Sequence, residues 1–255
     1  MALQAATGQI SFPSNDDSPD CCKICCRAKG GLSMTLQTIT YELSYRTLSI
    51  FDDCPRCFYQ KIKSKIDRPS EPFPSLPSGM DLLLKSYFDT WQSRGVLPKE
   101  LLSIEGISYF HDKELLRRWR GAGVRWTDGV GNVLVGDLDH VFVKKDKLLV
   151  ADFKTRGFAV KRDTARYYIK QMQVYNFLLR KEGYKTNDDA LLLFYHPVGV
   201  SDGAIVQFQV TPVYVHADPN GVEQWFAQAV ACLNGKLPKP SDSCRYHCWA
   251  KRKVT

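Results

Sequence analysis

The chain has 255 residues, and its 35 Lys and Arg residues against 27 Asp and Glu give a formal net charge of +8 at pH 7. Hydrophobic residues make up 44% and charged residues 24%, a globular composition that excludes disorder for most of the chain. No run of about 18 uncharged apolar residues is present, which excludes a hydrophobic transmembrane helix. Residues 1–30 carry no secretory signal pattern, so we expect a cytoplasmic protein without a membrane partner.

The N-terminal segment, residues 1–36, is expected to be a disordered tail, and residues 37–255 a single folded domain. The stretch TGQISFPSNDDSPD is polar and aperiodic, and the segment CCKICCRAKGG after it ends in two glycines. Two alternatives stay open. The four cysteines of residues 21–26 could form a small metal knuckle, or the physiological start could be Met34.

The rest of the chain alternates between helical and strand patterns. A short loop and a helix are predicted over residues 41–63, followed by a Pro-rich linker over 67–79. Further helices are predicted over about 79–94, 112–120, 164–183 and 221–235, with Ser78 and Asp218 as expected N-terminal caps. Strands are predicted over 132–143, 147–155, 190–196 and 204–215. This order indicates an α/β or α+β fold, of which we expect α/β, with a central mixed sheet flanked by helices and an N-terminal helical part.

The most informative segment is VGDLDHVFVKKDKLLVADFKT, residues 135–155. Side chains alternate between the faces of a strand, so Asp152 and Lys154 project on one face, as do Asp137 and Asp139 on the preceding predicted strand. A carboxylate at the end of an apolar strand is costly unless it is paired or metal-bound. Carboxylates from adjacent strands can bind Mg²⁺ and a nearby ammonium can assist phosphodiester hydrolysis; the alternative is a solvent-exposed Asp–Lys pair.

Four motifs follow one another along the chain. SYRTLSIFDDCPRCFY begins at Ser44, GDLD ends at Asp139, ADFKT contains Asp152 and Lys154, and QMQVY carries a Gln and a Tyr on one helix face. In this order they resemble the PD-(D/E)XK nuclease superfamily, and specifically its RecB-type branch, which includes CRISPR-associated and AddB-type exonucleases. The resemblance implies a restriction-endonuclease-like core.

The same resemblance implies a reaction. Asp139 and Asp152 would bind Mg²⁺ or Mn²⁺ together with the backbone carbonyl of Phe153, and Lys154 would be the catalytic lysine. The implied activity is metal-dependent hydrolysis of phosphodiester bonds in DNA, exonuclease-like at ends or single strands. The alternative is a catalytically weak or inactive nucleic-acid-binding module of the same fold.

The resemblance implies supporting roles for two helical residues, and one helix departs from the pattern of the branch. Gln171 and Tyr175 would complete the site or contact nucleic acid, although Tyr175 also suits a core position. Many RecB-type members carry a metal-binding His in an early G-x-x-x-H helix, and here Leu83 stands at that position. Asp81 and Lys85 lie nearby, and Asp81 could replace the missing ligand or serve only as a first-turn acid.

The cysteines form two short motifs, CPRC with Cys54 and Cys57 and CRYHC with Cys244 and Cys248. Iron–sulfur members of the branch use one N-terminal and three C-terminal cysteines, so this chain departs from their pattern. A two-plus-two set of thiolates suits either a [4Fe–4S] cluster or Zn²⁺. The alternative is four thiols without a metal.

Positive charge is concentrated around these motifs. Residues 141–185 contain twelve Lys and Arg against four Asp and Glu. We therefore expect a nucleic-acid partner, DNA by the resemblance, with salt-sensitive affinity. Tyr167 and Tyr168, beside Arg166, could stack on unpaired bases or pack against the sheet. The sequence leaves cleavage polarity, exonuclease or endonuclease mode, and protein partners open.

Overall fold

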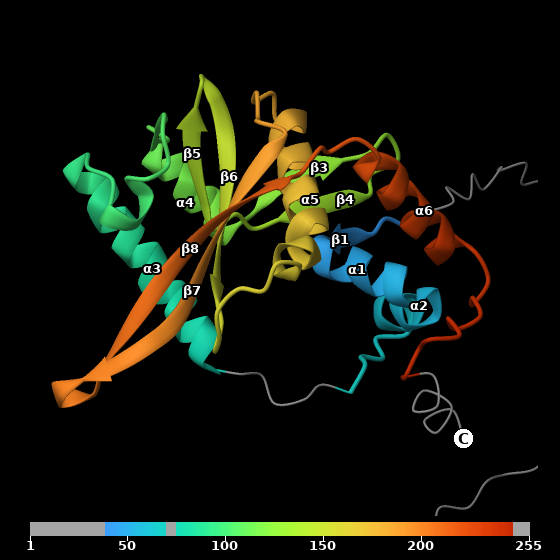
Figure 1. The fold of residues 1–255 in the computed structure, drawn as a ribbon. Helices are drawn as coiled ribbons and strands as arrows, with labels where there is room; N and C mark the ends of the chain where they lie inside the picture. The colour runs from blue at the N-terminus through green and yellow to red at the C-terminus, as the bar shows by residue number, and fades with distance from the viewer. Residues whose placement is uncertain (1–38, 70–74, 247–255) are drawn as a thin grey trace, which may run out of the picture. The chain divides into compact units, whose positions relative to one another are not determined.

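The computed structural model describes residues 39–69 and 75–246 (Figure 1). The predicted tail, residues 1–36, and Cys248 lie outside these ranges. Within them, a five-stranded mixed sheet is flanked by helices and accompanied by a second, three-stranded sheet. The predicted α/β class with a mixed sheet is therefore confirmed.

The larger sheet has the strand order β2-β5-β6-β7-β8. Its strands are β2 (Ile107–Tyr109), β5 (His140–Lys144), β6 (Lys147–Thr155), β7 (Asp189–Ser201) and β8 (Ile205–His216). Strands β6 and β7 run parallel, with Asp152 opposite Leu192, and the other pairs are antiparallel. The apolar side chains of β6 are buried on both faces, as expected for a central strand covered by helices.

The smaller sheet has the order β1-β4-β3. Its strands are β1 (Glu42–Ser44), β3 (Val124–Thr127) and β4 (Val133–Gly136). Because β4 and β5 belong to different sheets, the prediction of one continuous strand over residues 132–143 is wrong. The chain leaves β4 at Asp137 because the next backbone groups bond to a helix instead of a strand. The Leu138 N–H donates to the Trp119 carbonyl (3.3 Å), and Arg120 Nε donates to the Asp139 carbonyl (2.7 Å).

Six α-helices are present in the described ranges. They are α1 (Tyr45–Asp53), α2 (Pro55–Lys63), α3 (Ser75–Arg94), α4 (Lys113–Gly121), α5 (Ile169–Lys181) and α6 (Val222–Asn234). Helix α1 begins at a reciprocal cap, in which the Ser44 N–H donates to Thr47 Oγ1 at 2.8 Å. None of the helices in this part of the chain combines the length and apolar character needed to cross a membrane.

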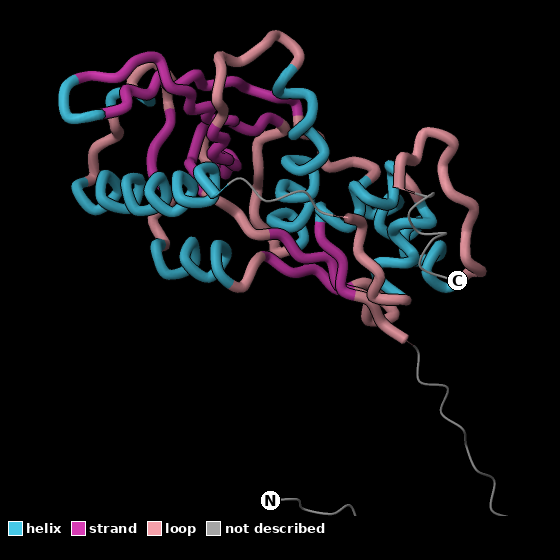
Figure 2. The backbone as a smooth tube through the Cα atoms, turned by 90° about the horizontal axis from the view of Figure 1, so that it is seen from below, coloured by secondary structure: helices cyan, strands magenta, loops and turns pink. Residues whose placement is uncertain are grey.

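Helices α3 and α5 cover opposite faces of the larger sheet. Leu84 and Phe88 of α3 pack on the face that carries Phe142 and Phe153, and Phe88 stacks on Phe153 with ring centroids 4.7 Å apart. Figure 2 shows α3 lying along this side of the strands. Helix α5 packs on the other face, between the two sheets, where its apolar side chains join the main core. The side chain of Asp152 therefore points toward α5.

Three predicted helix starts need correction. Helix α3 begins at Ser75, so Ser78 lies inside the helix and the predicted linker over 67–79 is too long. The predicted helix over 164–183 is a 3₁₀ turn, Thr164–Tyr168, followed by α5. Helix α6 begins after Gly221, whose positive φ of 91° redirects the chain. The Asp218 side chain bonds to Asn220 in the preceding turn instead of capping the helix.

One glycine of the GDLD motif brings α5 close to the end of β4. A Cβ atom on Gly136 would lie 2.8 Å from Leu178 Cδ1 and 2.9 Å from Tyr175 Cε1. Any larger residue would push the helix away from the sheet. Gly136 therefore sets the distance at which α5 presents its polar side chains to the strand ends.

Candidate active site

A cavity of about 940 Å³ opens where α3, α5, β6 and the end of β4 meet. The residues that the motifs singled out outside the cysteine pairs all line it. They are Asp81, Asp139, Asp152, Phe153, Lys154, Gln171 and Tyr175. Residues separated by almost a hundred positions in the sequence thus line one cavity.

Asp152 is the most deeply buried acid of the cavity, with 2% of the residue exposed. Its Oδ1 accepts a hydrogen bond from Gln171 Nε2 at 3.3 Å, and its Oδ2 forms an ion pair with Lys154. Apart from that ion pair, Oδ2 has no hydrogen-bond donor among the described residues. Burial, with the nearby Asp139 carboxylate adding to it, raises the pKa of Asp152 to about 7, although Lys154 opposes the shift.

Asp139 lies between the two sheets, directly before β5, and its oxygens have separate partners. Oδ2 accepts the backbone N–H of Phe153 at 3.0 Å, which joins this carboxylate to β6 next to Asp152. Oδ1 lies 3.0 Å from Lys85 Nζ of α3. Asp139 is not part of a strand, so the prediction that it projects from one is wrong. Its carboxylate still reaches β6 through the hydrogen bond from Phe153.

Arg120 of α4 holds the backbone of Asp139 in place. This role could not be predicted from the segment RRWR, in which Arg120 is one of three arginines. Besides the Asp139 carbonyl, its guanidinium contacts Asp89 Oδ1 (2.7 Å) and donates to His140 Nδ1 (2.8 Å). Burial and the Arg120 charge hold the pKa of His140 well below its usual range. His140 is therefore neutral, with Nδ1 as acceptor, and forms part of the support behind Asp139.

Helix α3 contributes a bridging ammonium. Lys85 Nζ lies 2.8 Å from Asp81 Oδ2 and 3.0 Å from Asp139 Oδ1. Burial lowers the pKa of Lys85, but the charges and hydrogen bonds of Asp139 and Asp81 outweigh it, and the net shift is upward. Leu83 is 66% exposed and does not line the cavity. Asp81 is thus the α3 acid that approaches Asp139, with Lys85 between them.

Helix α5 organises Lys154 through an amide. Gln171 Oε1 accepts from Lys154 Nζ (3.3 Å), and its Nε2 donates to the Tyr175 hydroxyl (2.8 Å). The Lys154 ammonium also lies over the Tyr168 ring, 4.8 Å from the centroid. Burial raises the pKa of Tyr175 well above its usual range, so its hydroxyl stays protonated. Tyr175 is both a core aromatic and the group that orients Gln171.

A second cluster of side chains, made of cysteines, lies where α1 ends and α2 begins. The Sγ atoms of Cys54, Cys57 and Cys244 all lie within 4.8 Å of one another, and all three residues are buried. Cys54 precedes Pro55, the first residue of α2, and Cys57 follows one turn later on the same face. The Cys57 and Cys244 sulfurs are 3.5 Å apart, a non-covalent distance. Three of the four predicted thiols therefore converge.

The thiols differ in how readily they ionise. Burial alone would raise the pKa of Cys54, but hydrogen bonds from the backbone N–H groups of Cys57 and Ser241 lower it to about 7. Burial raises the pKa of Cys57 to about 12, despite the neighbouring guanidinium of Arg68. A metal that binds thiolates would displace these protons, and this donor set fits Zn²⁺ or an iron–sulfur cluster.

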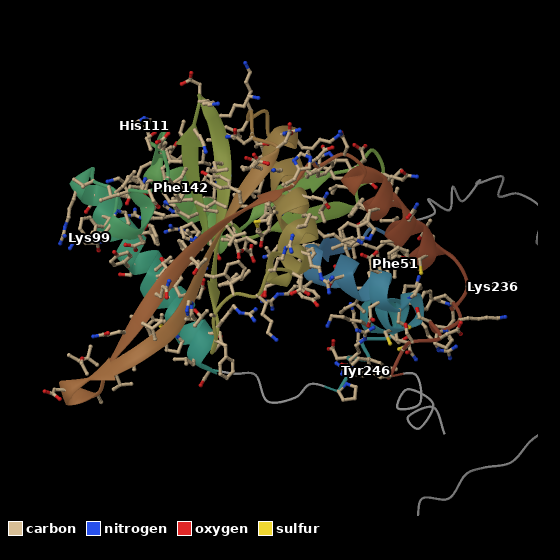
Figure 3. The ribbon with its side chains drawn as sticks, viewed as in Figure 1. Phe51, Lys99, His111, Phe142, Lys236 and Tyr246 are labelled. Carbon is tan, nitrogen blue, oxygen red and sulfur yellow. The ribbon has the colours of Figure 1, made fainter. Side chains whose placement is uncertain are left out.

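His111 does not belong to either cluster. Its side chain is exposed at the outer edge of the molecule and does not line the cavity (Figure 3). Among the described residues, the cavity offers carboxylate and amide oxygens, which are ligands for hard cations such as Mg²⁺ or Mn²⁺. Its lysine and arginine side chains cannot bind a cation and suit an anionic substrate instead.

A sequence model of the PD-(D/E)XK nuclease superfamily matches residues 81–252. The chain belongs to this superfamily. Its mixed sheet with flanking helices is the restriction-endonuclease-like core that the motifs predicted. Membership in the PD-(D/E)XK superfamily implies metal-dependent nuclease activity in general, usually with Mg²⁺ or Mn²⁺, and a nucleic-acid substrate.

Two further comparisons add less. A search of curated proteins finds no significant match. Among solved structures, the chain is similar to one described as "Crystal structure of SSO0001", at 13% identity and a TM-score of 0.37, over 84% of this chain and 83% of that chain.

Proposed function

We propose that this PD-(D/E)XK protein hydrolyses phosphodiester bonds of DNA, acting as a RecB-type exonuclease on ends or single strands. The observation that carries the proposal is the approach of two carboxylates, Asp139 and Asp152, from different elements beside the ammonium of Lys154. Two acids that share one cavity with a lysine match the donors that metal-assisted hydrolysis requires. The basic surplus of residues 141–185 supports a polyanionic substrate.

The proposed metal ligands are Asp139, Asp152 and the backbone carbonyl of Phe153, with Asp81 as a further candidate. The buried Asp152 Oδ2 supports this assignment, because among the described residues it has no partner besides the Lys154 ammonium and could accept a further cation. A bound Mg²⁺ or Mn²⁺ would supply Lewis acidity and an activated water. Lys85 would have to release Asp139 Oδ1 in that state.

The remaining residues would act on the substrate side. Lys154, held by Gln171 and by the Tyr168 ring, would contact the scissile phosphate or orient the attacking water. Gln171 would keep both Lys154 and Asp152 in place, and Tyr175 would keep Gln171 in the required rotamer. Arg120, which also lines the cavity, would position the Asp139 backbone.

The cysteine cluster is proposed to hold a structural [4Fe–4S] cluster or Zn²⁺. Cys54, Cys57 and Cys244 would supply three thiolates, and Cys248, which lies outside the described residues, is the proposed fourth ligand. Such a site would link the α1–α2 corner to the segment that follows α6.

Lys154→Ala is expected to lower Mg²⁺- or Mn²⁺-dependent degradation of labelled DNA by about a hundredfold, because the charge facing the phosphate is lost. The matched control is Lys147→Ala, which removes an exposed lysine at the start of the same strand and should leave the rate unchanged. Single-stranded, duplex and flap substrates should be compared under each metal. Equal rates for wild type and Lys154→Ala would contradict the proposed role of Lys154.

A second candidate function is a nucleic-acid-binding module of the same fold with little or no turnover. It is favoured by Leu83, which is exposed where many relatives of the RecB branch carry a metal-binding His. This candidate predicts salt-dependent DNA binding that survives Asp152→Ala and no cleavage under any divalent metal. The substrate panel above therefore separates the two functions.

A further inference from the structure

The connection between β6 and α5, residues 156–167, borders the mouth of the cavity. The residues on either side of it, Thr155 and Tyr168, both line the cavity. Within the connection, Phe158 is 84% exposed, the highest value among the large apolar side chains of the described ranges, and Tyr167 is 63% exposed. Two aromatic rings are therefore presented to solvent, one three residues after the cavity-lining Thr155 and one directly before Tyr168.

This connection is anchored to the body of the protein. Val160 packs against the main core, and Thr164 is buried with its Oγ1 accepting the backbone N–H of Lys161 at 3.1 Å. At the far end, the Tyr45 hydroxyl of α1 donates to the Tyr167 carbonyl at 3.5 Å. Val160 and Thr164 therefore hold the connection against the protein, while Phe158 of the same connection stays exposed.

The same connection is basic. Lys161 and Arg162 are exposed, and neither forms an ion pair with any residue in the described ranges. Its one acid, Asp163, pairs with Arg166 at 3.2 Å. The Arg166 guanidinium lies over the Tyr167 ring, 5.0 Å from the centroid, and donates to the Tyr167 hydroxyl at 3.0 Å. Along this connection, two exposed cations without an ion pair among the described residues thus stand in sequence between two exposed aromatic residues.

We propose that this connection is a binding platform for an unpaired nucleic-acid strand. Phe158 and Tyr167 stack on bases, and Lys161 and Arg162 contact the phosphates between them. Base faces are available for stacking only where the strand is unpaired, so the platform selects single-stranded over duplex substrate. The inference rests on the proposed nuclease function and names the form of nucleic acid that enters the cavity.

The test is fluorescence anisotropy of the full chain with labelled oligo-dT and with a duplex of equal length, without added divalent metal. Phe158→Ala is expected to weaken binding of the single strand by about tenfold and of the duplex by less than about twofold. Phe158→Trp should restore single-strand binding, because an aromatic face is retained. Val130→Ala is the control, since Val130 is 62% exposed in the β3–β4 turn and does not line the cavity.

The salt dependence separates stacking from charge. Lys161→Ala is expected to reduce the slope of log affinity against log salt concentration by about 0.7, whereas Phe158→Ala should leave the slope unchanged. Equal losses on single-stranded and duplex DNA, no loss for Phe158→Ala, or no binding by the wild type would each overturn the platform.

The platform and the nuclease proposal fail in different ways. The platform alone would be overturned if the wild type cleaves DNA and Phe158→Ala keeps both full cleavage activity and unchanged affinity for the single strand. Single-strand binding that depends on Phe158, without cleavage under any divalent metal, would uphold the platform and overturn the proposed catalytic function.

Discussion

Asp152→Asn is expected to lower the metal-dependent cleavage rate by about a thousandfold or more. The amide keeps the size of the side chain and can still accept from Gln171, but it removes the negative charge that we propose binds the cation together with Asp139. The measurement is kcat/KM on labelled single-stranded DNA across a Mg²⁺ and Mn²⁺ titration. The control is Asp146→Asn, an exposed acid in the turn that joins β5 to β6, which should retain full activity.

The same substitution should stabilise the metal-free protein. The pKa of Asp152 is raised from 3.8 to about 7, so the folded state binds this proton more tightly than the unfolded state does. Stability is therefore lost as the pH rises from about 4 to about 7, and Asn removes that cost. We expect Asp152→Asn to raise the melting temperature by at least about 3 °C at pH 8 and by less at pH 5.

A loss of stability at pH 8 would contradict this account of Asp152. Such a result would mean that the ion pair with Lys154 outweighs the cost of burial. Divalent metal should reverse the ranking, because it stabilises the wild type by binding the folded state and has little affinity for Asp152→Asn.

Cys57→Ser is expected to abolish binding of the metal that we propose for the thiol cluster and to lower the melting temperature by about 10 °C or more. The reason is that Cys57 is buried at the first turn of α2, with its sulfur 3.5 Å from that of Cys244, so its loss opens the proposed site. The measurement is iron, sulfide and zinc content of purified protein, followed by thermal melting.

The control for this prediction is Cys232→Ala, in α6 and outside the cluster, which should keep full metal content. Brown colour with bound iron and sulfide would identify a cluster, and stoichiometric zinc would identify Zn²⁺. Wild-type protein without any metal, or equal metal content in Cys57→Ser, would contradict the proposed site.

The periodicity of strands and helices is sufficient to predict which side chains of a single strand or helix lie next to each other. Asp152 and Lys154 lie two residues apart on β6 and are in contact, and Gln171 and Tyr175 lie one helical turn apart on α5 and share a hydrogen bond. The central strands were also predicted, because their apolar runs are long and end at clear turns.

Features set by distant contacts were not predictable in the same way. Strand β4 ends at Gly136 because the following residues form hydrogen bonds with Trp119 and Arg120 of α4. The sequence around Gly136 contains no pattern that predicts these bonds. Strand β1 has three residues and exists through pairing with β4, where Glu42 lies opposite Val133. The exposed Phe158 was likewise indistinguishable in the sequence from a core aromatic, because only the packing decides its exposure.

The most direct test of the proposed centre is anomalous diffraction from crystals of the protein grown or soaked with Mn²⁺. We predict a single manganese peak in the cavity, with oxygens of both Asp139 and Asp152 about 2.1 Å away and Lys85 withdrawn from Asp139. A peak bound elsewhere, or an occupied cavity in which the two carboxylates do not share the ion, would contradict the account.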